Sequence, residues 1–394
     1  GPPERFADFF VGPIHAQQSR LSKGEFNSPE GDFGLYPSTR AGEFGEGVTN
    51  MKTSVSLGAY GRTGIKDLTE YVQIAERLGV HSVWSAEAWG TDAVTSLAYL
   101  AGQTEKIRLG TGIMQISARV PSMTAMTALS LNDISDGRFT LGLGVSGPQV
   151  VEGLHGASYK APLSRLRETV EILRMAFRGE KLAFEGKYHT LPRQGGEGKA
   201  IRLNHRPAEI PIFLATLAPK SLEFTGAAAD GWLGTSFSPD YADAHLAHIR
   251  EGAQKAGRTM ADIELHVGCQ VEIGQNVEEI IDSKRPGVAF QMGAMGSAQT
   301  NFYNDAFKRA GFTDDALAIQ KLWIEGKRDE AAKRVPDEMV TKFGAFGTPE
   351  MVKARFKQYE DVGISSLSLR IDQEAPQKER IETLEQVMDL VNAS

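Results

Sequence analysis

Short apolar runs alternate with helical patterns from Thr53 to the end of the chain. This alternation is typical of repeated βα units, and it predicts a parallel sheet because consecutive parallel strands need a crossover connection of helix length. In the first unit, residues 53–57 predict a strand, and a helix follows that ends at Gly79. The apolar positions at helical spacing in that helix are Leu68, Tyr71, Val72, Ala75 and Leu78.

The same reasoning predicts eight strands in all. They span residues 53–57, 81–85, 107–111, 139–145, 212–215, 231–234, 263–273 and 365–371. The helix before the last strand has Thr348 as its N-cap and Pro349 at its first helical position, which are favoured residues there. A final helix is predicted from the apolar spacing that begins at Ile381 and ends at Val391.

Eight βα units predict an α/β fold of the (β/α)8 TIM-barrel class, with insertions at about 180–209 and 282–346. The alternative is an open, doubly wound sheet, but no GxGxxG motif opens the first βα turn. We assign residues 51–394 to the barrel domain. Residues 1–50 are rich in Gly, Pro, Ser and Glu without a sustained period, and we interpret them as an N-terminal extension, either tag-derived or a native arm.

Composition limits the partners and the compartment. The formal net charge of −7 gives no general reason to expect nucleic-acid binding, which needs a basic surface. No apolar run approaches the roughly 18 residues that span a bilayer, and we expect no membrane partner and a cytoplasmic location. The single cysteine, Cys269, excludes an internal disulfide and suits a reducing compartment.

The candidate catalytic residues are Glu87 and His155. In a barrel of this class the active site lies at the C-terminal ends of the strands, and Glu87 follows the second strand closely. Its carboxylate can orient a polar group or exchange a proton, or it can be a structural acceptor for backbone amides. Trp89 beside it is a candidate for packing or for binding. His155 can protonate or position a substrate, although a lone histidine is often structural.

Glycines at the ends of the third and fourth strands predict a cofactor surface. Gly112 and Ile113 follow the third strand, and Val145, Ser146 and Gly147 end the fourth. Glycine at a strand end allows a close approach of backbone to ligand, and successive amides can line a flat heteroaromatic ring. The competing interpretation is that these glycines only allow side chains to pack tightly in one layer of the barrel interior.

The fifth strand leads into a helix through small residues and a hydroxyl, which predicts an anion site at the helix N-terminus with Lys220 adding charge. This candidate loop consists of Ala215, Thr216, Leu217, Ala218, Pro219 and Lys220. Lys284 and Arg285 are further candidates for phosphate binding. No cluster of His, Cys and carboxylates has the spacing of a metal site, so no metal is predicted.

Several motifs, in this order and spacing, resemble the luciferase-like flavin-dependent oxidoreductases over residues 51–394. They are residues 84–92, 109–113, Pro121, 137–144, 146–153 and 229–232. Within that superfamily the chain resembles the branch that uses the deazaflavin coenzyme F420, which includes methylenetetrahydromethanopterin reductase. The stretches 146–153 and 301–304 carry this finer resemblance.

The resemblance implies a non-prolyl cis peptide at Gly112–Ile113 that backs the deazaflavin ring, an active-site role for Glu87, and coenzyme contacts from 145–147 and 215–220. It also implies a homodimer. Ala88 and Gly147 stand where the sugar-phosphate dehydrogenases of this branch carry a histidine and a glutamate, so sugar-phosphate oxidation is not expected.

We therefore expect an F420-dependent oxidoreductase that transfers a hydride between C5 of the deazaflavin and a small organic substrate. One alternative keeps the fold and uses FMN and oxygen as a monooxygenase. Another is a barrel without catalysis that binds a flavin or a partner.

Overall fold

The structure is a computed structural model that describes residues 51–58, 64–295 and 301–392. The interpretation of residues 1–50 as an extension lies outside these residues. Among the helices described, none is long and apolar enough to cross a membrane.

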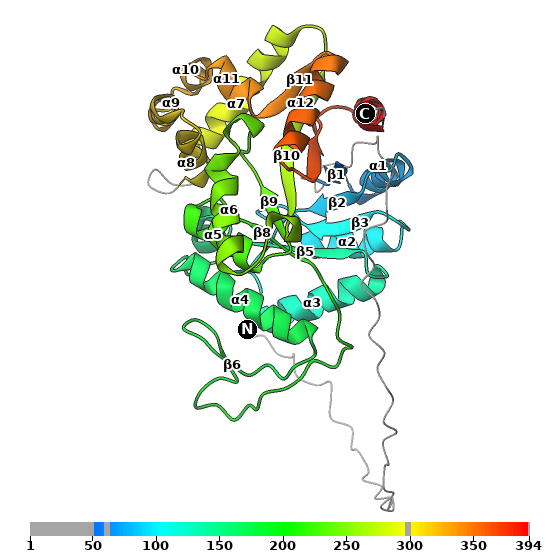
Figure 1. Cartoon of the computed structure of the whole chain (residues 1–394), viewed down its shortest axis with the longest axis vertical. Helices are drawn as coiled ribbons and strands as arrows, with labels where there is room; N and C mark the ends of the chain where they lie inside the picture. Colours follow the sequence, from blue (N-terminus) through cyan, green and yellow to red (C-terminus); the bar gives the residue numbers. More distant parts are fainter. Residues whose placement is uncertain (1–50, 59–63, 296–300, 393–394) are drawn as a thin grey trace, which may run out of the picture. The chain divides into compact units, whose positions relative to one another are not determined.

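Eight parallel strands form a closed barrel, which confirms the predicted fold class (Figure 1). Around the ring the order is β1, β2, β3, β5, β8, β9, β10 and β12, and β10 closes it by pairing with both β9 and β12. Each coincides with one of the eight predicted strands. Their bounds are β1 (Lys52–Ser56), β2 (Ser82–Ser85), β3 (Arg108–Thr111), β5 (Phe139–Gly144), β8 (Ile212–Ala215), β9 (Gly231–Gly234), β10 (Glu264–Ile273) and β12 (Ser366–Arg370).

Four short strands lie outside the ring. β4 (Met114–Gln115) pairs with the end of β5, and β11 (Gly344–Gly347) pairs with the second half of β10. β6 (Phe184–Glu185) and β7 (Thr190–Leu191) form a separate antiparallel pair within the predicted insertion at 180–209.

Helices follow the strands as the sequence predicts. The barrel helices are α1 (Ile65–Arg77), α2 (Ala93–Ala101), α3 (Pro121–Ile134), α4 (Pro162–Phe177), α5 (Pro219–Ala228), α6 (Asp243–Lys255), α12 (Pro349–Asp361) and α13 (Gln377–Asn392). Thr348 caps α12 through a hydrogen bond that its hydroxyl accepts from the amide of Met351. Gly79 and Gly179 follow α1 and α4 with φ of 86° and 70°, the left-handed conformation that ends helices.

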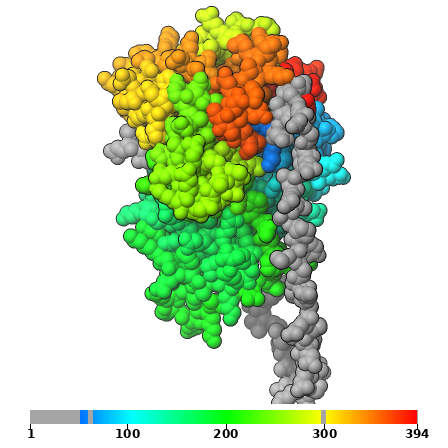
Figure 2. Space-filling model, viewed as in Figure 1, coloured from blue at the N-terminus to red at the C-terminus, as the bar shows by residue number. Residues whose placement is uncertain are grey.

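Five helices lie between β10 and β11, across most of the predicted insertion at 282–346. They are α7 (Val277–Gly293), α8 (Phe302–Arg309), α9 (Thr313–Ile324), α10 (Arg328–Lys333) and α11 (Asp337–Thr341). They have an apolar core of their own that includes Met292, Phe307 and Ile319. In Figure 2 these helices, yellow to orange, lie together at one end of the barrel unit, opposite α3 and α4.

Alternate residues of each strand face opposite sides of the barrel wall. Val267 and Leu367, paired across β10 and β12, belong to the core between strands and helices. The intervening positions face the barrel interior, where the rings of Trp84, Phe213 and His266 meet at centroid distances of 4.8 and 5.8 Å.

The inward side chains depend on glycines in neighbouring strands. A Cβ on Gly110 would lie 2.4 Å from the Trp84 ring, and one on Gly231 would lie 2.5 Å from the Phe213 ring. Because two large rings occupy the space that glycine leaves open, the interior of the barrel is filled at its middle.

His245 on α6 is buried against the outer surface of the barrel. Its ring lies 5.5 Å from Trp232 and 5.9 Å from Phe237, and neither ring nitrogen has a hydrogen-bond partner among the residues described. Burial, with Arg309 and His248 nearby, lowers the pKa of His245 to about 4. The native state therefore holds the neutral imidazole.

A pH titration of stability tests this description. Between its ordinary pKa of about 6.5 and the native value of about 4, His245 binds a proton in the unfolded state but not in the native state. The free energy of unfolding should therefore fall as pH is lowered across this window, by up to about 3 kcal/mol. In His245→Phe that part of the loss should disappear, as measured by urea unfolding at pH 7 and pH 4.5.

The control is His205→Phe, since His205 is exposed. This variant should keep the wild-type pH dependence, to which the half-buried His81 and the buried His266 contribute with the same sign. An unchanged slope in His245→Phe would contradict the buried, neutral state of this residue.

Candidate functional site

Glu87 lies just beyond the C-terminal end of β2 and is only 8% exposed. One carboxylate oxygen accepts hydrogen bonds from the Gln115 amide at 3.1 Å and from the Arg119 guanidinium at 2.6 Å. The other oxygen accepts from the Ala93 amide, at the start of α2, at 3.3 Å. Glu87 is therefore a buried, ion-paired carboxylate that joins β2, β4 and α2, as its structural interpretation requires.

Gln115 connects the two candidate catalytic residues. Its backbone amide bonds to Glu87, and its side-chain amide nitrogen lies 3.0 Å from Nε2 of His155. In this structure the amide oxygen of Gln115 accepts from the Ser117 hydroxyl at 3.3 Å, which places the amide nitrogen toward His155. Gln115 then donates to Nε2, so a neutral His155 carries its proton on Nδ1.

The peptide bond between Gly112 and Ile113 is cis, as the family resemblance implies. Gly112 is exposed at the end of β3, and its amide donates to the Ser85 carbonyl at 2.7 Å. The Ile113 carbonyl accepts from the amide of Glu87 at 3.3 Å. Both sides of this peptide are thus held by β2, which leaves the backbone of Gly112 open to the mouth of the barrel.

Gly144 is the point where three predicted segments meet. A Cβ on this residue would lie 2.5 Å from Cδ1 of Ile113 and 3.5 Å from Cβ of Ala215. The Gly144 carbonyl also accepts from the amide of Ile116 at 3.1 Å. The ends of β3, β5 and β8 therefore converge, with backbone and small side chains at the contact.

Val145, Ser146 and Gly147 continue from this point and are half-buried. Ser146 has a φ of 59°, the left-handed conformation that a serine adopts only when its surroundings require it. Its carbonyl accepts from the Tyr159 hydroxyl at 3.2 Å, and burial, with Glu152 nearby, raises the pKa of Tyr159 to about 12. The phenol thus stays protonated as the donor that holds this turn.

The loop from Ala215 to Pro219 lies at the N-terminus of α5. Thr216 shares a 2.7 Å hydrogen bond with Thr225, and the Leu217 carbonyl accepts from the Arg309 guanidinium of α8 at 2.8 Å. Ala218 is the N-cap and Pro219 occupies the first turn. Small residues and helix amides are therefore presented at the barrel mouth, and α8 lies against this loop.

The two basic candidates for phosphate binding have other partners. The Lys220 side chain is 75% exposed and pairs with Glu223 at 2.9 Å. Arg285 bonds to Asp282, Asp337 and the Val335 carbonyl, all within the 277–341 helices. Lys284 pairs with Glu272 at 2.5 Å. Their contacts connect none of them to the cluster of Glu87, Gly112 and Gly144.

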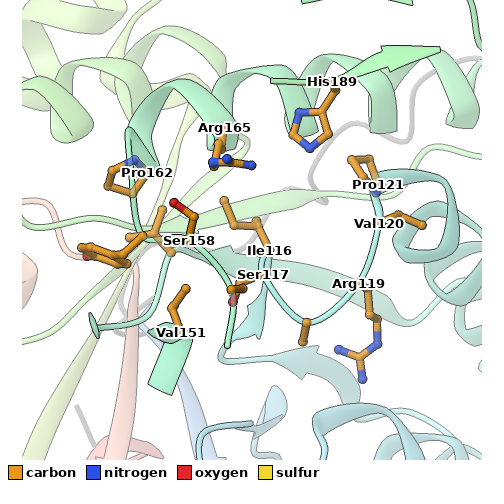
Figure 3. A pocket seen from close by; sticks show the side chains of 14 residues that line it. Ile116, Ser117, Arg119, Val120, Pro121, Val151, Ser158, Pro162, Arg165 and His189 are labelled. Carbon is orange, nitrogen blue, oxygen red and sulfur yellow. The ribbon is translucent and has the colours of Figure 1, made fainter. Parts of the chain in front are cut away.

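A cavity of about 300 Å³ borders this cluster. Val145, Arg119 and Tyr159 contribute to its wall, but Glu87 and Gly112 do not. Figure 3 shows Arg165 and His189 on one side of the cavity and Ile116 and Ser117 facing them, while the Arg119 guanidinium points away. That direction agrees with its ion pair to Glu87.

One group of possible metal ligands occurs in the part of the chain that the structure describes. It consists of Glu223, His248 and Glu251, whose ligand atoms lie within 4.8 Å of one another on α5 and α6. Lys255 pairs with both carboxylates, at 3.6 and 2.5 Å, and supplies the compensating charge. We assign no metal to this group.

Three residues of the site were not predicted from the sequence. Gln115 and Arg119 lie 28 and 32 positions from Glu87, and Arg309 lies 92 positions from Leu217. The signal that could have identified Gln115 is a polar residue two positions after Ile113, at the end of the third strand. Trp89, which the sequence offered for packing or binding, is 69% exposed and therefore is not packed in the core.

Comparison with known proteins gives a consistent family. Residues 47–366 match a family model described as luciferase-like monooxygenase. A Mycobacterium tuberculosis protein provisionally named a coenzyme F420-dependent oxidoreductase is 37% identical, over 80% of this chain and 94% of that protein. A 5,10-methylenetetrahydromethanopterin reductase of Archaeoglobus fulgidus is 28% identical over 76% and 88%.

A solved structure shows the same fold. The coenzyme F420 dependent tetrahydromethanopterin reductase of Methanopyrus kandleri superposes with a TM-score of 0.71 and 22% identity, covering 86% of this chain and 97% of the other.

The Glu87–Arg119 pair can be tested by its effect on stability. The Glu87 side chain is 6% exposed, so Arg119→Ala leaves a buried carboxylate without its cation. We expect the free energy of unfolding in urea to fall by about 1–3 kcal/mol. In a double-mutant cycle with Glu87→Gln, the two losses should not add.

The surface pair Arg178–Glu180 is the control, because both side chains are well exposed at 57% and 44%. Arg178→Ala should leave unfolding nearly unchanged. If Arg119→Ala behaves like this control, or if the cycle is additive, the pair does not organise the site.

Proposed function

Because the chain belongs to the luciferase-like monooxygenase family, we propose that it is an F420-dependent oxidoreductase that transfers a hydride between C5 of the deazaflavin and an organic substrate. The mycobacterial relative, at 37% identity, is named for coenzyme F420. The archaeal relative, at 28% identity, is named for the methylenetetrahydromethanopterin that it reduces. The convergence of three strand ends at Gly144 is the observation in this chain that supports the proposal most directly.

The residues present fit a flat ring. The exposed Gly112, the half-buried Ile113 and the half-buried Ala215 offer backbone and small apolar groups at one side of the mouth. Since Gly144 lacks a Cβ, no side chain separates Ile113 from Ala215. In this proposal the ring rests on the Gly112–Ile113 peptide, and Val145, Ser146 and Gly147 contact its attached chain.

The amides at the start of α5 would meet the phosphate of the coenzyme, through Leu217 and Ala218. We leave Arg285 out of the proposed site, because its guanidinium already has partners within the 277–341 helices. Lys220 would contribute only long-range charge, given its exposure and its pair with Glu223.

When bound, the deazaflavin would supply the hydride donor or acceptor, and this chain's residues would supply orientation and hydrogen bonds. Glu87 positions the 112–115 segment through its bond to the Gln115 amide. His155 is exposed and is held through Nε2 by Gln115, which leaves its Nδ1–H to donate a hydrogen bond to the substrate. Glu87 is thus a positioning residue, and His155 is the candidate residue for positioning the substrate.

Coenzyme titration tests the proposal. Purified protein should quench F420 fluorescence on binding and should bind FMN much more weakly. Gly144→Ala should weaken F420 binding roughly tenfold, because the new Cβ displaces Ile113 from beneath the ring.

The control is Gly153→Ala, where a Cβ would meet no atom within 4 Å. Tight binding of FMN without a response to F420 would support the monooxygenase alternative instead. Failure to bind either coenzyme would favour a barrel without catalysis.

We further propose that the protein is a homodimer that associates through α2 and α3. These neighbouring helices expose large apolar side chains on their outer surface. Met123, Met126 and Ile134 of α3 are 49–54% exposed, and Tyr99 of α2 is 43% exposed. On α3 these positions recur along one helical stripe, and such a stripe on a surface marks an association site.

A charge placed in this stripe should separate the subunits. Met126→Glu is expected to shift the mass measured by light scattering after gel filtration from dimer to monomer. Met351→Glu, an equally exposed methionine on α12, should leave the mass unchanged. A dimer that survives Met126→Glu, or a monomeric wild type, would reject this interface.

A further inference from the structure

Arg370, the last residue of β12, is exposed although it lies on a barrel strand. It pairs in register with Gln270 of β10, which is also exposed. Two positions earlier on these strands, Gly268 pairs with Ser368, and two earlier again His266 pairs with Ser366. Since His266 faces the barrel interior, the alternation of strands places Gln270 and Arg370 on the same inner wall, at the C-terminal mouth.

Gly268 provides the space for the arginine. A Cβ on Gly268 would lie 2.5–2.6 Å from Nε, Cζ and one terminal nitrogen of Arg370. The guanidinium therefore folds over Gly268 toward the barrel axis. Gly110 and Gly231 make room for Trp84 and Phe213 in the same way, but those rings are buried and fill the interior.

Arg370 has no counter-charge within the described residues. The Arg370 guanidinium makes no ion pair and no hydrogen bond with any described residue. The Gln270 side chain likewise makes no hydrogen bond with a described residue. Barrel interiors are usually filled by branched apolar residues, so a guanidinium at the C-terminal mouth that has no ion pair or hydrogen bond to the described residues points to a ligand. A guanidinium matches the geometry of carboxylate and phosphate groups.

The topology places this pair across from the proposed coenzyme surface. In the ring of eight strands, β12 is four places from β5 and β10 is four places from β3. Arg370 and Gln270 thus face the segment of Gly112, Ile113 and Gly144 across the mouth. The α8 helix lies beside this mouth: its Arg309 donates to the Leu217 carbonyl at 2.8 Å, and Arg370 is near enough to its Tyr303 to act on the phenol.

We propose that Arg370, with Gln270, binds a carboxylate or phosphate group of the substrate over the open face of the coenzyme. The identity of the neighbouring coenzyme in this proposal rests on the proposed function. The anion site itself rests only on the placement of Arg370 over Gly268. The substrate class is then an organic anion.

The test uses inorganic phosphate as the probe, followed by ³¹P line broadening at constant ionic strength with the full chain. Arg370→Ala should weaken phosphate binding roughly ten- to a hundredfold, and Arg370→Lys should restore part of it. Gly268→Ala keeps the charge but displaces the guanidinium, and it should weaken binding severalfold. Arg193→Ala removes the same charge from an exposed loop and should have no effect.

Two results would overturn the proposal. Equal phosphate binding by wild type and Arg370→Ala would remove Arg370 from any anion site. Loss of phosphate binding on saturation with F420 would assign the site to the coenzyme's own phosphate, whereas simultaneous binding supports a substrate site. If wild type binds phosphate through Arg370 but does not bind F420, the proposed function fails and the anion site stands.

Discussion

Pairing of β10 with both β9 and β12 closes the sheet, and every other feature of the site depends on this closure. An open sheet would place the ends of β3 and β10 far apart on one edge. In a closed ring of eight strands they face each other across the mouth. Closure also explains why glycines are needed, since the inward Trp84 and Phe213 can be accommodated only where Gly110 and Gly231 leave space.

The site itself is organised by hydrogen bonds to the short β4 strand. The Gln115 amide bonds to Glu87, its side chain bonds to His155, and its neighbour Ile116 bonds to Gly144. The segment after the cis peptide therefore connects β2, β5 and the loop that carries His155. Arg119, at the end of the same segment, neutralises the buried Glu87. In the proposed site Glu87 therefore acts as a positioning residue, since its carboxylate accepts from the backbone amides of Gln115 and Ala93.

The sequence predicted the fold well because its information is local. Alternation along each strand and capping residues such as Thr348 depend on near neighbours, and all eight strands were found in order. The active site lies at the C-terminal strand ends in barrels of this class, so Glu87, Gly112 and Ser146 could be placed at one end of the barrel. The side chains that pair with each site residue could not be predicted, because strand register and helix packing determine which residues meet. Lys220 and Arg285 were chosen for their charge, and Glu223 and Asp337 already pair with them. The sequence does not single out Arg370, because nothing local distinguishes it from an arginine at the end of any other strand.

The outward and inward faces of the barrel wall contribute differently to stability and to the site. Outward positions such as Val83, Leu141 and Val267 are fully buried against helices and carry the apolar burial that stabilises the fold. Inward positions are mostly serine, glycine and threonine, including Ser54, Gly142 and Ser366. These small inward residues contribute little apolar burial themselves, and the glycines among them are needed because a Cβ would meet a neighbouring ring or backbone atom. Polar residues near the C-terminal mouth, Gln270 and Arg370 among them, are then explained by the anionic ligand that we propose for them, since the fold does not require them.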